Sequence, residues 1–343
     1  MSMKPLLLIL PLMCLFTLNL SGQRLPFFMP EDVESTTLNV KCYCSPGVEY
    51  KSRSRGLELS FTRNTSADLR AEDGSNLSFP FSSRSINYYK FSLRYPVINK
   101  DNLKIIAGII YKPEQFRFRS IGSEFSPVFA KLNEVNLKSS GFEAIIVKPI
   151  NEKIYTTFRV RSIFNGDYNG LINFDSRFAV YNFSAAIGFK TSKWREWAIG
   201  LNYSDSFRRS ILLPFLIYNH TFNEKWGIES VLPALLNVRY NVSPKTILLT
   251  GLRFASSSYS LRLDDGISNE IFALNHSEIK FTVNVEQKLS SWFWVDFALG
   301  YQYNFNTDFE AQLDANDSFQ VRPKSSPFFK IGIFLSPPDD FLK

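Results

Sequence analysis

Side chains that could carry out catalysis are few in this sequence of 343 residues. The two histidines are His220, in YNHTF, and His276, in ALNHSEIK, where Ser277 and Glu278 follow directly. A serine, a histidine and a carboxylate could together form a nucleophile with its general base. Successive residues of a strand point to opposite faces, however, so His276 and Ser277 cannot share one lumen. The usual hydrolase, phosphate-loop and zinc-protease motifs are also missing, so we predict no catalytic residues and not an enzyme.

Metal-binding chemistry has little support either. Cys42 and Cys44, in KCYCS, could be an incidental pair, a local disulfide or a fragment of a metal site. No third cysteine follows them to complete a thiolate site, so an incidental pair is favoured. Asp264-Asp265-Gly266 lacks the alternating oxygen ligands and the distal glutamate of a calcium loop, and it indicates a turn. We therefore predict no metal site and no cofactor.

Charged residues that alternate with apolar ones are more informative. Arg159 and Arg161 alternate with Phe158 and Val160, which places both arginines on the polar face of a segment. In a membrane barrel such a face lines the lumen, where charges either pair into a network that fills the interior or set ion selectivity. Both interpretations remain open. The lumen-facing candidates are Arg159, Arg161, Arg239, Lys280, Glu286 and Asp296.

Long strands must position these residues. In WVDFALGYQYNF (294–305), the odd positions from Val295 are apolar or aromatic and the even positions are small or polar. This period of two recurs in many segments, and it predicts strands with two different faces. Many segments reach about ten residues, the ~9–11 that cross a bilayer rather than the ~5–6 usual in globular sheets. Less regular strand-like stretches lie at 86–96, 102–113, 137–149, 153–164, 210–222, 225–240, 244–263 and 326–336.

The connections indicate a membrane barrel. Short turns such as PINEK (149–153) and KLSSW (288–292) alternate with long polar segments such as 114–136 and 306–325. Outer-membrane barrels have short periplasmic turns, longer extracellular loops and an even number of strands. We therefore predict an all-β fold, an antiparallel transmembrane β-barrel of roughly 12–14 strands. Two consecutive short connections, 222–226 and 241–245, require at least one short connection on the outer side as well.

The tryptophans fit the same interpretation, because all five lie beside short turns. Indole rings prefer the headgroup level of a bilayer, and barrels carry aromatic girdles there. The predicted membrane-interface anchors are Trp194, Trp197, Trp226, Trp292 and Trp294.

The N-terminus predicts export. Residues 1–22 contain a basic Lys4, an apolar run over 6–18 and a small-residue cleavage site, the layout of a secretory signal peptide. The predicted organisation is a signal peptide at 1–22, an N-terminal periplasmic extension at 23–54, the transmembrane β-barrel at 55–336 and a C-terminal tail at 337–343. The predicted location is the outer membrane of a Gram-negative bacterium, with outer-membrane lipid and the insertion machinery as partners. Charges are interspersed, so no nucleic-acid partner is expected, and the sequence does not predict the oligomeric state.

Two stretches carry a resemblance to a known family. PGVEYKSRSRGLELSF (46–61) and LPFLIYNHTFNEKWGIESVLPALLNVRYNVSPKTILLTG (213–251) resemble an uncharacterised outer-membrane β-barrel family of Bacteroidota. The resemblance covers most of the mature chain and implies a signal peptide and a barrel. It implies no functional residue, because the family has no assigned activity.

These observations lead to a ranked set of functions. The first hypothesis is an outer-membrane channel or transporter for small solutes, with an unknown substrate. The alternative is a structural or surface-interaction barrel that uses its extracellular loops without transport. An outer-membrane enzyme is disfavoured by the scarcity of histidine, and a secreted soluble β protein remains a further possibility that fractionation would exclude.

Overall fold

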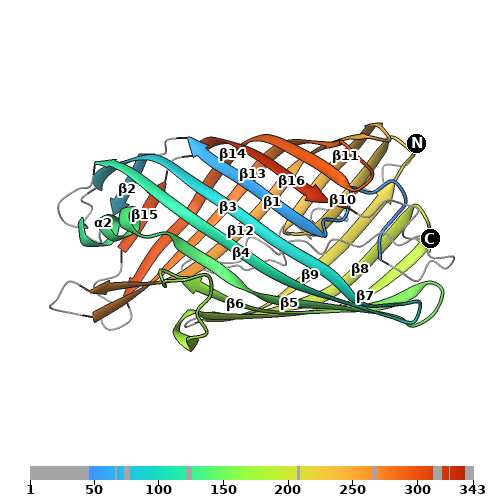
Figure 1. Ribbon diagram of the computed structural model, residues 1–343, viewed down its shortest axis with the longest axis horizontal. Coiled ribbons are helices and arrows are strands. Elements are labelled where there is room, and N and C mark those ends of the chain that lie inside the picture. Colours follow the sequence, from blue (N-terminus) through green and yellow to red (C-terminus); the bar gives the residue numbers. More distant parts are fainter. Residues whose placement is uncertain are drawn as a thin grey trace, which may run out of the picture.

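The chain forms a closed antiparallel β-barrel of fourteen strands (Figure 1). The structure is a computed structural model that describes residues 46–65, 68–72, 78–120, 126–206, 209–264, 269–311, 319–323 and 325–336. The predicted signal peptide, Cys42 and Cys44, Asp265-Gly266 and the predicted C-terminal tail lie outside these ranges. An even number of strands allowed twelve or fourteen, and the structure confirms fourteen.

From β3 to β14 the strands follow one another around the barrel in chain order, each paired with its neighbours in the sequence. The first half of the described chain contains β1 (Leu57–Thr65), β2 (Asp68–Glu72), β3 (Ser78–Lys100), β4 (Leu103–Ser120), α2 (Ser126–Glu134), β5 (Leu137–Pro149), β6 (Ile154–Gly166), η1 (Ser176–Phe178) and β7 (Ala179–Ser192). The second half contains β8 (Arg195–Ser206), β9 (Arg209–Thr221), β10 (Trp226–Leu232), β11 (Leu235–Ser243), β12 (Thr246–Asp264), β13 (Asn269–Lys288), β14 (Phe293–Ala311), β15 (Phe319–Pro323) and β16 (Ser326–Leu335).

The ring closes where the first and last strands meet. β1 pairs with β3 on one side and with β16 on the other, from Leu57 opposite Leu335 to Asn64 opposite Phe328. β2 and β15 continue these two strands beyond short interruptions and pair with each other. Sixteen strand segments therefore make fourteen barrel strands, with β1–β2 and β15–β16 each counted once.

The two faces of the strands differ as the alternation predicts. On β14, Phe297, Leu299 and Tyr301 are about half exposed, whereas Asp296, Ala298 and Gln302 between them are buried inside the barrel. Exposed apolar side chains continue on the outer surface of the neighbouring strands, among them Ile279 and Phe281 on β13. An apolar outer belt around a polar interior is the surface of a barrel that faces lipid.

The two ends of the barrel differ in their connections. At the right-hand end in Figure 1, strands join through short turns such as 101–102, 193–194, 244–245 and 289–292. The left-hand end carries the longer connections, with α2, β2 and β15. One expectation fails here, because 225–240 is not one strand. It is the β10–β11 hairpin, which turns at Pro233-Ala234 and supplies the short outer connection that the turn pattern requires.

Two further elements modify the expected loops. The segment 114–136, expected as a loop, contains the end of β4 and the helix α2, and the strand-like stretch 244–263 forms the single strand β12. The far end of β12 leans across the interior towards β6, where Ser260 pairs with Gly166 and Asn165 Nδ2 donates to the Ser258 carbonyl at 2.9 Å. Among the described residues, no helix is long and apolar enough to cross a membrane.

Candidate functional site

The barrel interior encloses a chamber of about 370 Å³. Its lining includes polar and charged side chains from β1, β3, β13 and β16, and apolar side chains from β9 to β12 such as Ile217, Val231 and Leu235. Cavities of roughly 300–1,000 Å³ are the usual size of small-molecule sites. The chamber is therefore the candidate functional site, and what closes its two ends decides what can enter it.

At the short-turn end, residues 46–56 lie across the mouth of the barrel, and we call this segment the strap. It enters β1 at one edge and reaches β8 on the opposite side of the ring, where the Gly47 N–H donates to Glu196 Oε1 at 2.7 Å. Beside β8, the Glu49 N–H donates to the Lys193 carbonyl at 2.9 Å, and Tyr50 stacks on Trp194 with centroids 5.6 Å apart. Residues 46–54 of the strap belong to the predicted periplasmic extension (23–54), and they lie across this mouth of the barrel.

Inward-facing carboxylates hold the strap in place. Ser52 donates to Glu229 through both its N–H (2.8 Å) and its hydroxyl (2.5 Å). The Arg55 guanidinium contacts Glu286 at 2.6 Å and Glu58 at 2.8 Å, and it lies 3.6 Å from Asp296. Hydrogen bonds to charged groups are worth roughly 1.5–3 kcal/mol each. The strap is thus attached mainly by side-chain contacts to carboxylates and not by a strand ladder.

Towards the opposite end, helix α2 packs against the inner wall of the barrel. Phe129 and Leu132 of α2 are buried against inward-facing residues of β12, β13 and β14, with Leu261, Leu274 and Phe309 in the same cluster. The Phe129 ring meets Phe118 and Phe309 edge-on, with centroids 5.5 and 5.9 Å apart. This cluster fills part of the lumen at the end of the long connections with apolar side chains, and we call it the plug.

A row of charged residues crosses four neighbouring strands on the inner wall. Arg94 on β3 lies opposite Gly108 on β4, Gly108 opposite Glu143 on β5, and Glu143 opposite Arg161 on β6. The Glu143 carboxylate receives Arg94 Nε at 2.6 Å, Arg159 Nη2 at 2.6 Å and Arg161 Nη2 at 3.2 Å. A side chain at position 108 would come within 2.8 Å of Glu143 Cγ, so the glycine lets Arg94 reach across β4. Three buried guanidiniums therefore share one carboxylate.

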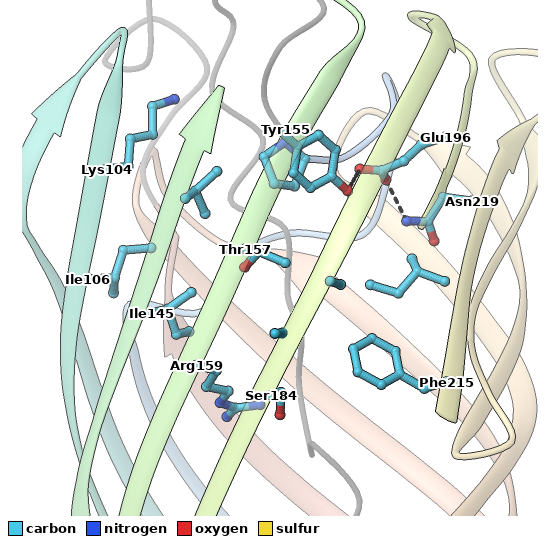
Figure 2. A pocket seen from close by; sticks show the side chains of 15 residues that line it. Lys104, Ile106, Ile145, Tyr155, Thr157, Arg159, Ser184, Glu196, Phe215 and Asn219 are labelled. Atoms are coloured by element: carbon cyan, nitrogen blue, oxygen red, sulfur yellow. Dashed lines mark hydrogen bonds between the residues drawn. The ribbon is translucent and has the colours of Figure 1, made fainter. Parts of the chain in front are cut away.

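An apolar part of the inner wall adjoins this cluster. A small pocket of about 40 Å³ lies between Arg159 at one end and Tyr155, Glu196 and Asn219 at the other (Figure 2). Ile145, Ala186 and Phe215 form its sides. At the polar end, Tyr155 Oη and Asn219 Nδ2 donate to the two Glu196 oxygens at 2.5 and 2.7 Å, as the dashed lines in Figure 2 show. These two hydrogen bonds hold the Glu196 carboxylate in the position where it also accepts the Gly47 N–H of the strap.

The predicted lumen residues all lie inside the barrel and are engaged there. Arg159 and Arg161 belong to the cluster around Glu143, and Arg239 contacts Glu229 at 3.0 Å and the Thr221 hydroxyl at 2.9 Å. Lys280 contacts Glu278 at 2.6 Å. Glu286 forms an ion pair with Arg55, and Asp296 forms an ion pair with Lys330 at 2.8 Å. In this conformation all six candidates are thus ion-paired, and Glu286 and Asp296 help hold the strap.

His276 lines the chamber, and its two ring nitrogens contact Thr307 and Glu278 rather than Ser277. Its Nδ1 lies 2.8 Å from the Thr307 hydroxyl and its Nε2 lies 2.9 Å from Glu278. Ser277 turns away and bonds to Ser256 at 2.9 Å. His220 instead lies near a short turn, 3.2 Å from the Tyr218 hydroxyl.

The tryptophan prediction needs one correction. Trp226 and Trp292 are exposed beside short turns, Trp197 stacks on Phe189, and Trp194 stacks on the strap. Trp294 is 1% exposed and packs inside the barrel against Phe334, with centroids 6.0 Å apart. The physical reason is the period of two, because an even position on this strand points inward with Asp296 and Ala298. Trp294 is therefore part of the interior beneath the strap.

Sequence reasoning missed the strap and the Glu143 cluster. Residues 46–54 contain no alternation that marks a strand, so nothing in their pattern indicated a location inside the barrel. Glu143 and Arg94 lie on strand-like stretches, but their contact depends on a register across β3, β4 and β5 that no single segment contains.

Tyr50 and Asp175, both outside the spanning strands, have shifted pKa values. Partial burial, together with the nearby Glu224 and Glu49 carboxylates, raises the pKa of the Tyr50 phenol, so it stays protonated and donates to Glu224. In the 167–178 connection, hydrogen bonds from Arg177 lower the pKa of Asp175 to about 2. Both groups therefore keep their charge state through neutral pH.

The closed even-stranded barrel, with an apolar belt outside and charges inside, is the architecture of Gram-negative outer-membrane proteins. Residues 125–336 match the family described as "Domain of unknown function (DUF6268)". The match covers more than half of the chain, which therefore belongs to this family. Membership of this family assigns no activity to the protein, because the family's function is unknown.

Solved structures of outer-membrane barrels share the architecture at low similarity. An outer-membrane channel from Pseudomonas putida F1 has 13% identity and a TM-score of 0.39, covering 85% of this chain and 99% of the other. A Pseudomonas aeruginosa FadL homologue has 8% identity and a TM-score of 0.36, with 81% and 90% covered. The Escherichia coli outer-membrane protease OmpT has 8% identity and a TM-score of 0.29, with 84% and 100% covered. These values carry no conclusion about function, and no curated protein matches the sequence significantly.

Proposed function

We propose that the protein is an outer-membrane channel for small solutes and that the conformation described above is its closed state. The observation that carries this proposal is a chamber of about 370 Å³ inside a fourteen-strand barrel, between two closures made by the chain itself. A structural barrel that only presents loops needs no such internal space, because side chains can fill a lumen completely.

The strap is the closure that opens most readily in this proposal. Its contacts to Glu196, Glu229 and Glu286 are individual hydrogen bonds and ion pairs, which can break without disturbing the barrel ladder. Helix α2 is held by a buried aromatic cluster, whose separation would expose a much larger apolar area. We therefore place the moving part at the short-turn end, which is the periplasmic end in this proposal.

Liposome swelling tests the proposal. Purified folded barrel is reconstituted, and entry of neutral solutes of graded size is compared between the wild type, the strap variant Ser52→Ala/Arg55→Gln and the control Glu49→Gln. Glu49 pairs with Lys193 at the exposed rim, so this control leaves the inward contacts intact. We expect swelling to rise at least several-fold in the strap variant only. The proposal fails if a folded barrel lacking residues 23–54 admits no solute of any size.

A further inference from the structure

We propose that the outward-facing rim at the short-turn end binds the headgroup of a zwitterionic phospholipid, with Arg195 and His220 at its phosphate and Glu224 at its ammonium group. The site is a groove of about 670 Å³ between the β7–β8 turn and the β9–β10 turn. This inference goes beyond the channel function, because lipid binding can be measured whether or not the barrel conducts.

The outward direction of Arg195 and His220 follows from the alternation of their strands. Arg195 on β8 lies directly opposite His220 on β9. The next residues along these strands point inward, where Glu196 accepts a hydrogen bond from the strap and Thr221 contacts Arg239. Since successive residues of a strand point to opposite faces, Arg195 and His220 share the outer face of the barrel. Both therefore lie where a lipid headgroup can reach them.

The groove contains one positive and one negative side chain that are both available to a ligand. Arg195 and Glu224 are exposed, and neither forms an ion pair with a described residue; the Glu224 carboxylate accepts the Tyr50 hydroxyl at 3.5 Å. Of the other charged residues nearby, Lys193 pairs with Glu49 at 3.2 Å and does not line the groove. Two opposite charges that do not neutralise each other match a ligand that carries both a phosphate and an ammonium group.

The hydrogen-bonding groups fit the same assignment. His220 Nδ1 lies 3.2 Å from the Tyr218 hydroxyl, and Nε2 makes no hydrogen bond with a described residue. When the Tyr218 hydroxyl donates to Nδ1, Nε2 carries the ring proton and can donate it to a phosphate oxygen. The Arg195 guanidinium adds planar pairs of donors that suit phosphate, and the Glu224 carboxylate accepts from a primary ammonium group.

The surface beside the groove fits acyl chains. Away from the turns, the next outward pairs along β8 and β9 are Trp197 opposite Tyr218, and then Ile199 opposite Leu216. Ile199 and Leu216 are both exposed on the apolar belt. Aromatic side chains with a polar tip prefer the headgroup level of a bilayer, and the apolar belt faces its hydrocarbon. A phospholipid uses both surfaces, whereas a soluble phosphate compound gains nothing from the belt.

Native mass spectrometry of the folded barrel in a neutral detergent tests the headgroup assignment. The probes are phosphatidylethanolamine, phosphatidylglycerol and diacylglycerol with the same two oleoyl chains. The wild type should retain phosphatidylethanolamine at least fivefold more tightly than phosphatidylglycerol, which lacks the ammonium group, and phosphatidylglycerol more tightly than diacylglycerol. Equal retention of the two phospholipids would overturn the proposal.

Two variants separate the two charges. Arg195→Gln should weaken binding of both phospholipids at least threefold, whereas Glu224→Gln should weaken only phosphatidylethanolamine, by a similar factor. The controls Lys153→Gln and Glu152→Gln remove the same charges from the exposed β5–β6 turn, outside the groove, and should bind both lipids as the wild type does. If either groove variant binds phosphatidylethanolamine as tightly as its control, with the fold verified by gel mobility, the assigned site is wrong.

Photo-crosslinking tests the position of the lipid and distinguishes it from a soluble ligand. Phosphatidylethanolamine with a diazirine near the start of one acyl chain should label the outer face of β8 and β9, around Ile199 and Leu216. Labelling spread evenly around the barrel would contradict a specific site. Soluble glycerophosphoethanolamine, which has the same headgroup without chains, should not displace the label at equal concentration. Displacement would assign the groove to a soluble ligand and overturn the lipid assignment.

Discussion

At the scale of single residues, the interior of this barrel is organised by carboxylates that each serve several basic groups. Glu143 forms ion pairs with three arginines, and Glu58 forms ion pairs with Arg55, Lys90 and Lys330. Removing a shared counter-ion takes one carboxylate away from several buried charges at once, while removing one of several basic groups does not. The two kinds of substitution should therefore differ sharply.

The first prediction concerns Glu143. Glu143→Gln should lower the free energy of unfolding by about 3–5 kcal/mol, because three buried guanidiniums lose their common carboxylate. Arg161→Gln should cost much less, because Arg94 and Arg159 still neutralise Glu143. Urea unfolding in lipid vesicles, followed by the gel mobility of unheated samples, measures both. Equal destabilisation by the two substitutions would argue against the shared-carboxylate account.

The second prediction concerns the tryptophans. In variants that retain a single tryptophan, brominated lipid should quench the fluorescence of Trp226 and Trp292, which are 47% and 39% exposed. Trp294 should be protected, because it packs on Phe334 inside the barrel. Strong quenching of Trp294 by lipid would contradict its inward position.

At the scale of elements, strands were predictable from the sequence and the two closures were not. Alternation alone identifies the two faces of β14, because each strand shows its own period of two. The β10–β11 hairpin was missed because 225–240 remains strand-like on both sides of Pro233-Ala234. The positions of the strap and α2 were not predicted, for a different reason. Their positions depend on partners far away in sequence, such as Glu229 for Ser52 and Phe309 for Phe129.

The third prediction concerns the anchored end of the strap. Tyr155→Phe keeps the ring but removes the hydroxyl that donates to Glu196, so Glu196 should hold the Gly47 N–H less firmly. We expect faster protease cleavage after Lys51 in the folded barrel, by roughly fivefold, the effect of about 1 kcal/mol. Thr156→Ser, at the neighbouring position, is the control. Identical cleavage rates in both variants would show that Glu196 does not anchor the strap.

The fourth prediction concerns the outer plug. Phe129→Ala removes a buried ring from the α2 cluster and should weaken its packing by about 3–5 kcal/mol, as for other buried phenylalanines. The fourteen-strand ladder does not depend on α2, so the barrel should keep its gel mobility while amide exchange in residues 126–134 accelerates. Global unfolding of the barrel at the same urea concentration as loss of α2 would contradict a separable plug.

At the scale of the whole molecule, the protein combines a wide barrel with little open space. Fourteen strands enclose a lumen that the strap closes at one end and α2 closes at the other, leaving the chamber between them. The barrel wall is held by a continuous ladder of paired strands, whereas the strap is held by fewer and weaker contacts. In the proposed channel the strap, and not the barrel wall, decides whether solutes pass.

Single-channel recording in planar bilayers tests that claim most directly. The wild type should be silent or open only briefly, the barrel lacking residues 23–54 should show discrete and sustained conductance steps, and Ser52→Ala/Arg55→Gln should open more often than the wild type. The Glu49→Gln control should behave as the wild type. Equal conductance in the wild type and the barrel lacking residues 23–54, with both folds verified by heat-modifiable gel mobility, would overturn the proposed role of the strap.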